Sequence, residues 1–277
     1  MASEPPEALK NIKALTFDVF GTVVDWRSTV HDELVSRAQS KLDSDSPHSN
    51  TLPSTLQSRL RGLTDDDWAQ FAQEWRDSYM HFTRSFVPGE TAWKDIDTHH
   101  HDSLQVLLQK SYLNGLYSPA EVRELSLIWH RLRPWDDAAA GIRALGTRGL
   151  VTATLSNGNQ ALLRDLNAQG GGLGFKKIVS TADFGAYKPH PSTYLGAAAA
   201  LECRPDEVAM VAAHLGDLQA ARSCGLRTIY VERPREEAWA QDAARYREAR
   251  GWVDIWVGQG EGGFQEVARR LGISPDE

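Results

Sequence analysis

The sequence predicts an α/β fold in which a parallel sheet is covered by helices on both faces and a helical domain is inserted after the first strand. Two observations predict it. Through the C-terminal half, short apolar runs typical of buried strands alternate with helix-like segments, and this alternation indicates a parallel sheet. Between the first two strand-like runs lies a long aromatic stretch that is poor in strand-forming runs, which indicates a separate helical unit.

The first expected strand covers residues 12–17 and ends at Asp18. The further strands are expected at residues 150–155, 177–180, 208–213, 227–231 and 253–257. The helices between them are expected at residues 138–148, 160–169, 192–202, 218–224 and 239–250. We therefore assign residues 1–25 and 134–277 to a core domain and residues 26–133 to an inserted helical cap domain.

Aromatic residues recur at helical spacing within the insertion, which predicts the buried face of a helix rather than a cofactor site. They are Trp68, Phe71, Trp75, Tyr79, Phe82 and Phe86. Residues 43–58 are rich in Ser, Pro, Asn and Asp, and predict a mobile loop. The run from His99 to His101 predicts a solvated loop or helix end rather than a metal site, because adjacent residues do not share a helix face.

The composition limits the class of protein. The 277 residues carry a formal net charge of -7, which disfavours nucleic acid and anionic membrane as partners but does not exclude an anionic small substrate. No stretch has the apolar length of a membrane span, and residues 1–9 lack the apolar region of a secretory signal. The two cysteines, Cys203 and Cys224, form no disulfide framework, so we expect a cytoplasmic protein.

Polar side chains follow four of the expected strands. They are Asp18 and Thr22, then Ser156 and Asn157, then Lys188, then His214 and Asp217. Because the carboxyl ends of parallel strands meet at one edge of a sheet, we expect these residues to converge there.

The residue types indicate a covalent mechanism. Asp18 is a potential oxygen nucleophile, and Lys188 would keep it ionised. Asp217 would hold Lys188 or help to activate a water molecule. Ser156 and Asn157 can donate hydrogen bonds to an anionic substrate or to a leaving group.

The ordered set Asp18-x-Phe20-Gly21-Thr22, Ser156-Asn157, Lys188-Pro189 and Asp217 resembles the haloacid dehalogenase superfamily, which implies a Rossmann-like core with an inserted cap. Phosphatases of that superfamily carry a second aspartate two residues after the nucleophile, which protonates the leaving alkoxide. Here that position is Phe20. Since a halide leaves without a proton, the sequence resembles the L-2-haloacid dehalogenase branch.

This resemblance implies hydrolysis of small (S)-2-haloacids to 2-hydroxy acids through an ester on Asp18. It also implies that the backbone amides of Val19 and Phe20, together with the Ser156 hydroxyl, receive the substrate carboxylate, and that Thr22 helps to orient Asp18. The partner would be a small halogenated carboxylic acid, and members of the family are often dimers, so a homodimer is possible.

Three further positions carry alternatives. Arg76 matches a cap arginine that engages the halide or the substrate, or else it is a solvated helix charge. Tyr194, six residues after Lys188, matches an active-site tyrosine, or else it packs in the core. His214 stands where the best-known members have asparagine; it donates a hydrogen bond, handles the hydrolytic water, or is a strand-end histidine satisfied by backbone.

We expect no metal and no cofactor. Asp217 offers one acid where metal-dependent members offer paired acids, and Phe20 supplies only a backbone carbonyl, whereas magnesium prefers several oxygen ligands. Two other functions stay open: a magnesium-dependent phosphatase on the same scaffold, and a non-catalytic binding protein. Phe20 argues against the first, and the intact polar set argues against the second.

Overall fold

The computed structural model describes residues 4–43, 52–147 and 149–273. The chain divides into two compact units. The core unit consists of Met1–Asp25, Phe86–Thr91 and Arg133–Glu277, and the cap unit consists of Trp26–Ser85 and Ala92–Leu132. The segment Phe86–Thr91, which the sequence places inside the insertion, groups with the core unit.

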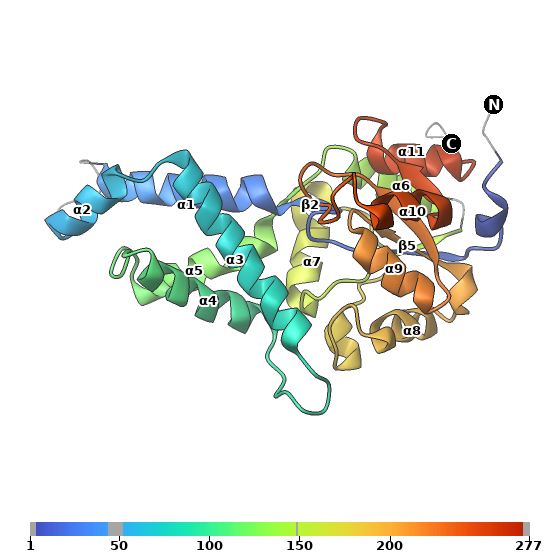
Figure 1. Cartoon of the computed structure of the whole chain (residues 1–277), viewed down its shortest axis with the longest axis horizontal. Coiled ribbons are helices and arrows are strands. Elements are labelled where there is room, and N and C mark those ends of the chain that lie inside the picture. Colours follow the sequence, from blue (N-terminus) through green and yellow to red (C-terminus); the bar gives the residue numbers. More distant parts are fainter. Residues whose placement is uncertain (1–3, 44–51, 148, 274–277) are drawn as a thin grey trace. The chain divides into compact units, whose positions relative to one another are not determined.

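A five-stranded parallel sheet forms the centre of the core unit (Figure 1). Its strands are β1 (Ala14–Phe17), β4 (Val151–Thr154), β5 (Val208–Ala212), β6 (Arg227–Val231) and β7 (Ile255–Val257), in the order β4-β1-β5-β6-β7. This confirms the predicted α/β class. Two short strands, β2 (Val24–Asp25) and β3 (Arg133–Pro134), pair antiparallel where the chain leaves the core unit and returns to it.

Helices cover both faces of the sheet, because its strands are apolar on both sides. One buried cluster joins the strands to α8 (Pro191–Ala200), α9 (Leu215–Ser223) and α10 (Ala244–Trp252). On the other face, the Phe17 ring meets Phe264 of α11 (Gly263–Arg270) edge-on at 5.2 Å, and α11 packs against α6 (Ala138–Thr147). Figure 1 shows α6 and α11 on one side of the sheet and α8 and α9 on the other.

Several elements of the core unit differ from the sequence prediction, and helix α9 begins at Leu215 rather than at 218. Residues 177–180 form only isolated bridges rather than a strand, because the Thr154 hydroxyl pairs with both the amide and the carbonyl of Val179 and takes the place of a backbone ladder. Helix α10 begins at Ala244 rather than at 239. Helix α11 was not predicted. Helix α7 (Gln160–Ala168), in contrast, ends close to its expected position.

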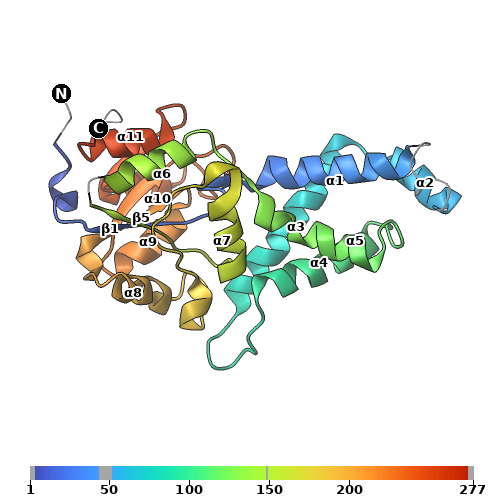
Figure 2. The same ribbon diagram turned by 180° about the vertical axis from the view of Figure 1, so that it is seen from behind.

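The cap unit is helical (Figure 2). Its helices are α1 (Trp26–Leu42), α2 (Ser54–Arg61), α3 (Asp65–Ser85), α4 (Ile96–Lys110) and α5 (Pro119–Ser126), followed by a 3-10 turn at Leu127–Arg131. Helix α3 buries Trp68, Phe71, Trp75 and Tyr79, as the helical spacing predicts, whereas Phe82 is half-buried. Phe86 lies beyond the end of the helix.

The predicted loop at residues 43–58 is wrong over its second half. Residues 44–51 lie outside the described residues, but α2 begins at Ser54. Pro53 precedes the first turn, and Leu56 and Leu60 share the buried side of the helix. The four-residue spacing of these two leucines favours a helix, and it is a better guide here than the polar composition that predicted a loop.

The prediction for the histidine run is also wrong. His99 and His100 lie within α4, and His100 is fully buried. Its ring stacks on Trp129 with centroids 4.4 Å apart, and burial lowers the pKa of His100 well below its ordinary value. Helical spacing places His100 on the same face as Leu104 and Leu107, which explains its burial. None of the helices in the described ranges is long and apolar enough to cross a membrane.

Candidate active site

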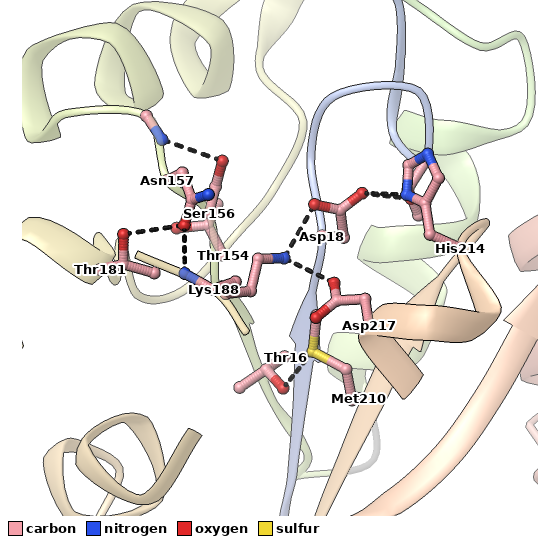
Figure 3. Close-up of polar contacts among 12 residues, drawn as sticks. Thr16, Asp18, Thr154, Ser156, Asn157, Thr181, Lys188, Met210, His214 and Asp217 are labelled. Carbon is pink, nitrogen blue, oxygen red and sulfur yellow. Dashed lines mark hydrogen bonds and ion pairs between the residues drawn. The ribbon is translucent and has the colours of Figure 1, made fainter. Parts of the chain in front are cut away.

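Predicted site residues from several loops gather at the carboxyl edge of the sheet (Figure 3). Asp18 follows β1, the turn at Ser156 and Asn157 follows β4, and His214 and Asp217 follow β5. Lys188 arrives from the loop before α8, and its backbone amide donates to the Asn157 side chain at 2.8 Å. The backbone amide of Asp18 donates to the Val211 carbonyl at 3.0 Å, which ties the residue to the end of β5.

The Asp18 carboxylate is surrounded by hydrogen-bond donors. Lys188 Nζ donates to Oδ1 at 2.9 Å, and Thr22 Oγ1 donates to Oδ2 at 2.7 Å. His214 Nδ1 lies 3.0 Å from the same Oδ2. Burial by itself would raise the pKa of Asp18, but the Lys188 ammonium and the His214 ring hold that pKa well below its ordinary value. Asp18 is therefore a carboxylate at any physiological pH.

Lys188 joins two carboxylates. Its Nζ also donates to Asp217 Oδ2 at 2.6 Å, and Tyr194 donates from its hydroxyl to Asp217 Oδ1 at 2.6 Å. Burial would lower the pKa of Lys188, but Asp18 and Asp217 raise it above its ordinary value. Tyr194 is fully buried, and burial together with Asp217 raises the pKa of its hydroxyl. Tyr194 thus holds Asp217, which holds Lys188. Its ring packs in the core while its hydroxyl contacts the site, so the two alternatives for this tyrosine are not exclusive.

His214 lies between two acids. Its Nε2 is 3.3 Å from Glu236 Oε2 on the side opposite Asp18. Burial would lower the pKa of His214, but hydrogen bonds to Asp18 and Glu236 raise that pKa to about 10. The ring is therefore an imidazolium at neutral pH, and it is satisfied by side chains rather than by backbone.

Glu236 is the site neighbour that sequence reasoning missed. It stands in a loop after β6 with two other glutamates, Glu232 and Glu237, and no spacing distinguishes it from them. Its proximity to the site is visible only in the structure, where a Cβ on Gly21 would overlap the Glu236 carboxylate.

The turn after β4 is built by its own side chains. Ser156 is fully buried, and its Oγ accepts a hydrogen bond from the Gly158 amide at 3.2 Å. Asn157 Oδ1 accepts from Thr181 Oγ1 at 3.1 Å as well as from the Lys188 amide. These bonds turn the Asn157 carbonyl toward the scaffold, and none of the described residues pairs with its Nδ2, which leaves that amide group available to an anion.

The two residues after Asp18 are buried and supply only backbone polar groups. Val19 and Phe20 are each 1% exposed. The Phe20 ring lies against Gly158, where an added Cβ would come within 3.4 Å of its Cζ. The Val19 amide donates to no backbone carbonyl in the described part of the chain. No side chain that can transfer a proton stands two residues after Asp18.

The comparison with known families decides the affiliation. A family model described as haloacid dehalogenase-like hydrolase matches residues 12–225. The chain belongs to this family. Among curated relatives, the (S)-2-haloacid dehalogenase 1 of Pseudomonas sp. (strain CBS-3) is 34% identical over 116 residues, or 40% of this chain and 51% of the relative. The match therefore spans about half the length of that protein.

Solved structures place the chain within the dehalogenase branch of the family. A defluorinating L-2-haloacid dehalogenase is similar with a TM-score of 0.77 and 28% identity, over 97% of this chain and 99% of that one. Another L-2-haloacid dehalogenase is similar with a TM-score of 0.73 and 30% identity, over 94% of this chain and 99% of that one. The predicted superfamily and branch are confirmed.

Arg76, which was predicted either to engage the halide or substrate or to be a solvated helix charge, is not a solvated charge. Arg76 belongs to α3 and is 8% exposed. Its guanidinium lies 4.6 Å from the centroid of the Tyr79 ring and 5.5 Å from that of Trp26. Aromatic faces stabilise a buried cation of this kind, so Arg76 is held among rings inside the cap unit. Its contact with a halide or a substrate stays a prediction.

The donor set does not fit a magnesium ion. The Lys188 ammonium lies between the carboxylates of Asp18 and Asp217, where a cation shared by these two acids would have to bind. Phe20 offers no carboxylate, and magnesium requires close to six oxygen ligands in octahedral order. Among the described residues, no group of three or more His, Cys, Asp or Glu side chains is arranged to hold a metal ion.

Proposed function

We propose that this protein hydrolyses the carbon–halogen bond of small (S)-2-haloacids and releases 2-hydroxy acids through an ester on Asp18. One observation carries the proposal. A buried carboxylate is kept ionised by Lys188, while the hydrocarbon ring of Phe20 stands where the hydrolysis of a phosphate ester would require an acid to protonate the leaving alkoxide. The names of the similar proteins agree with this chemistry.

In the first half-reaction, an Asp18 oxygen attacks the carbon that bears the halogen, from the side opposite the halogen. A carbon–oxygen bond forms as the carbon–halogen bond breaks, and the halide leaves with the electron pair. No proton is needed, so the absence of an acid at Phe20 costs nothing. Thr22 and Lys188 hold the carboxylate in one orientation, which keeps the reacting atoms aligned.

In the second half-reaction, water attacks the carbonyl carbon of the Asp18 ester. The ester bond breaks, the 2-hydroxy acid leaves, and Asp18 returns to the carboxylate with one oxygen from water. Because the attack at carbon proceeds from the back, an (S)-haloacid gives the hydroxy acid of inverted configuration.

The donors of the site are assigned to the negative charges of the substrate. The backbone amides of Val19 and Phe20 and the Ser156 hydroxyl are assigned to the substrate carboxylate, and Asn157 Nδ2 is assigned to the departing halide. Arg76 is assigned to the halide from the cap. Donors aimed at charge that develops during the reaction lower its barrier in a site that excludes water. Ser156 contributes by shaping the turn that presents Asn157.

The test is halide release from a panel of fluoro-, chloro- and bromo-acids in both enantiomers. The (S)-acids should release halide, and Asp18→Asn should abolish the release while leaving the circular dichroism spectrum unchanged. In a single turnover in ¹⁸O-labelled water, the label should enter Asp18 before it enters the product. Label that appears first in the product, or hydrolysis of a chromogenic phosphate ester in place of haloacids, would contradict the proposal.

We propose a cytoplasmic location from the cysteine usage and a homodimer from the habit of the family. The boundaries at residues 26 and 133 are likewise a proposal for where the cap domain begins and ends.

A further inference from the structure

The proposed nucleophile, Asp18, belongs to an array of three side chains in which His214 lies between Asp18 and Glu236. His214 contacts Asp18 through Nδ1 at 3.0 Å and Glu236 through Nε2 at 3.3 Å. The Glu236 side chain is 5% exposed, and the His214 side chain is 27% exposed. Gly21 is bare at the point where Glu236 crosses it, since any Cβ there would overlap the carboxylate. The array is therefore built into the loop that carries the nucleophile.

The charges around His214 change during the proposed reaction. In the resting enzyme its ring faces the Asp18 and Glu236 carboxylates, and Asp18 is also paired with Lys188, which Asp217 holds. With both acids ionised, the pKa of His214 is about 10, so the ring is protonated and cannot accept a proton. Esterification of Asp18 removes one of the two negative charges that stabilise the imidazolium.

We propose that His214 is the base for hydrolysis of the Asp18 ester, that it becomes available only after the ester has formed, and that Glu236 is the positioning residue that orients it. This inference rests on the proposed function. It assigns the second half-reaction to a pair of residues and orders the proton transfers within it.

The protons of the proposed cycle balance. When the halide leaves, Asp18 becomes a neutral ester and the imidazolium of His214 loses one proton to solvent. Neutral His214 then takes a proton from the attacking water. It returns that proton to the departing alkoxide, which leaves as the hydroxy acid. The Asp18 carboxylic acid finally transfers its proton to His214, which restores the resting ion pair. Each turnover thus consumes one water molecule and releases one halide and one proton.

Glu236 decides which nitrogen of the neutral ring is the base. If Nε2–H donates to Glu236, the lone pair lies on Nδ1, the nitrogen that faces Asp18. A base must lie within hydrogen-bond reach of the proton that it removes, and a water molecule held by Nδ1 would stand beside the ester carbonyl. Without Glu236 the ring is free to adopt the other tautomer, in which Nδ1 cannot accept a proton.

The first measurement uses the wild-type enzyme and (S)-2-chloropropionate in a single turnover. Chloride, protons and hydroxy acid are followed by stopped-flow and quenched-flow methods in weakly buffered solution with a pH indicator. One proton should appear in step with chloride and before the hydroxy acid. A proton that appears only with the hydroxy acid would overturn the inference. This measurement does not depend on the folding of any variant.

The second measurement compares Glu236→Gln with Glu237→Gln. Glu237 is a matched control, because its carboxylate accepts from the Leu215 and Trp239 amides at 2.6 Å each rather than contacting His214. In Glu236→Gln the chloride burst should persist, while ester hydrolysis slows by at least about tenfold and the ester on Asp18 accumulates in the intact-protein mass spectrum. The acid limb of the hydrolysis rate should also move to lower pH, because the imidazolium has lost its second anionic partner.

The outcomes separate the two proposals. If the wild-type enzyme releases no halide, or if Asp18→Asn still does, the proposed function fails. If the chloride burst is normal but Glu236→Gln hydrolyses the ester at the rate and pH dependence of Glu237→Gln, the function stands and the role of Glu236 is refuted. A merely structural role for Glu236 would change the amount of active enzyme without moving the pH limb.

Discussion

Replacing Lys188 with methionine leaves two buried carboxylates without the cation that lies between them. Nζ is 2.9 Å from Asp18 and 2.6 Å from Asp217, and the lysine side chain is 9% exposed. At a separation of 2.9 Å and an effective dielectric constant of about 20, one such pair attracts by about 6 kcal/mol. Desolvation offsets part of this attraction, and removal of one partner from a buried pair costs about 3–5 kcal/mol of unfolding free energy.

Lys13 provides the control at the same distance. Its Nζ is also 2.9 Å from a carboxylate, that of Glu207, but the lysine side chain is 63% exposed. Water screens an exposed pair, so its contribution to stability is small. We expect Lys13→Met to change the unfolding free energy much less than Lys188→Met.

The loss in Lys188→Met depends on pH. In the wild type the pKa of Asp18 is depressed, so its contribution to stability is present above the ordinary value of about 3.9 and is lost as the pH falls through the lower, folded value. In the variant, burial raises the pKa of Asp18, because the Lys188 charge, which is the largest cause that lowers this pKa, is gone. The variant is then stabilised by protonation, and the difference from wild type shrinks toward acid pH.

The assay is urea unfolding followed by circular dichroism at about pH 7 and about pH 5. The Lys188→Met deficit should be largest at the higher pH, and halide release should fall below detection or acquire a new acid limb. If Lys188→Met is no less stable than Lys13→Met, or if its deficit is equal at both pH values, then the argument from burial is wrong.

Three further outcomes are expected. Chelation by EDTA should leave halide release unchanged, because the Lys188 ammonium already lies between the two carboxylates; a loss restored by magnesium would contradict this. His100→Phe should preserve or raise the Tm, with the larger gain below about pH 6.5, because burial lowers the pKa of His100 and protonation in acid favours the unfolded chain; thermal scans at two pH values measure it. Arg233→Met should lower the unfolding free energy by about 3 kcal/mol, because Arg233 pairs with Asp137 at 2.6 Å and donates to the Thr22 carbonyl at 3.0 Å. Urea unfolding and kcat measure the effect, and no change in either would show that these contacts of Arg233 are dispensable.

The sequence could predict the site residues that directly follow the expected strands. Asp18 closes an apolar run, and in a parallel sheet every such run ends at the same edge, so a local pattern carries information about a distant contact. The contact between Lys188 and Asp18 spans 170 positions, yet it could be anticipated because both residues belong to ordered motifs at that edge.

Glu236 and His100 show where this reasoning stops. Glu236 is one of several glutamates in a loop without periodicity, and only its path over Gly21 brings it to His214. His100 sits in a run of three histidines that looks polar, and only the packing of α4 against the neighbouring rings buries it. A loop carries no repeating pattern from which burial can be deduced. The spacing of His100 from Leu104 and Leu107 indicates burial only once the histidine run is known to lie in a helix.

The sequence by itself determined the α/β class, the order of the motifs and the position of the proposed nucleophile at the end of the first strand. The spacing of apolar residues shows locally where strands and helices lie, and parallel strands all end at one edge of the sheet. Only the tertiary structure decided the protonation of His214, the chain of hydrogen bonds from Tyr194 through Asp217 to Lys188, and the presence of Glu236 in the site. Those features depend on distances between side chains of different elements and on their burial, and neither quantity is encoded in the spacing of residues along the chain.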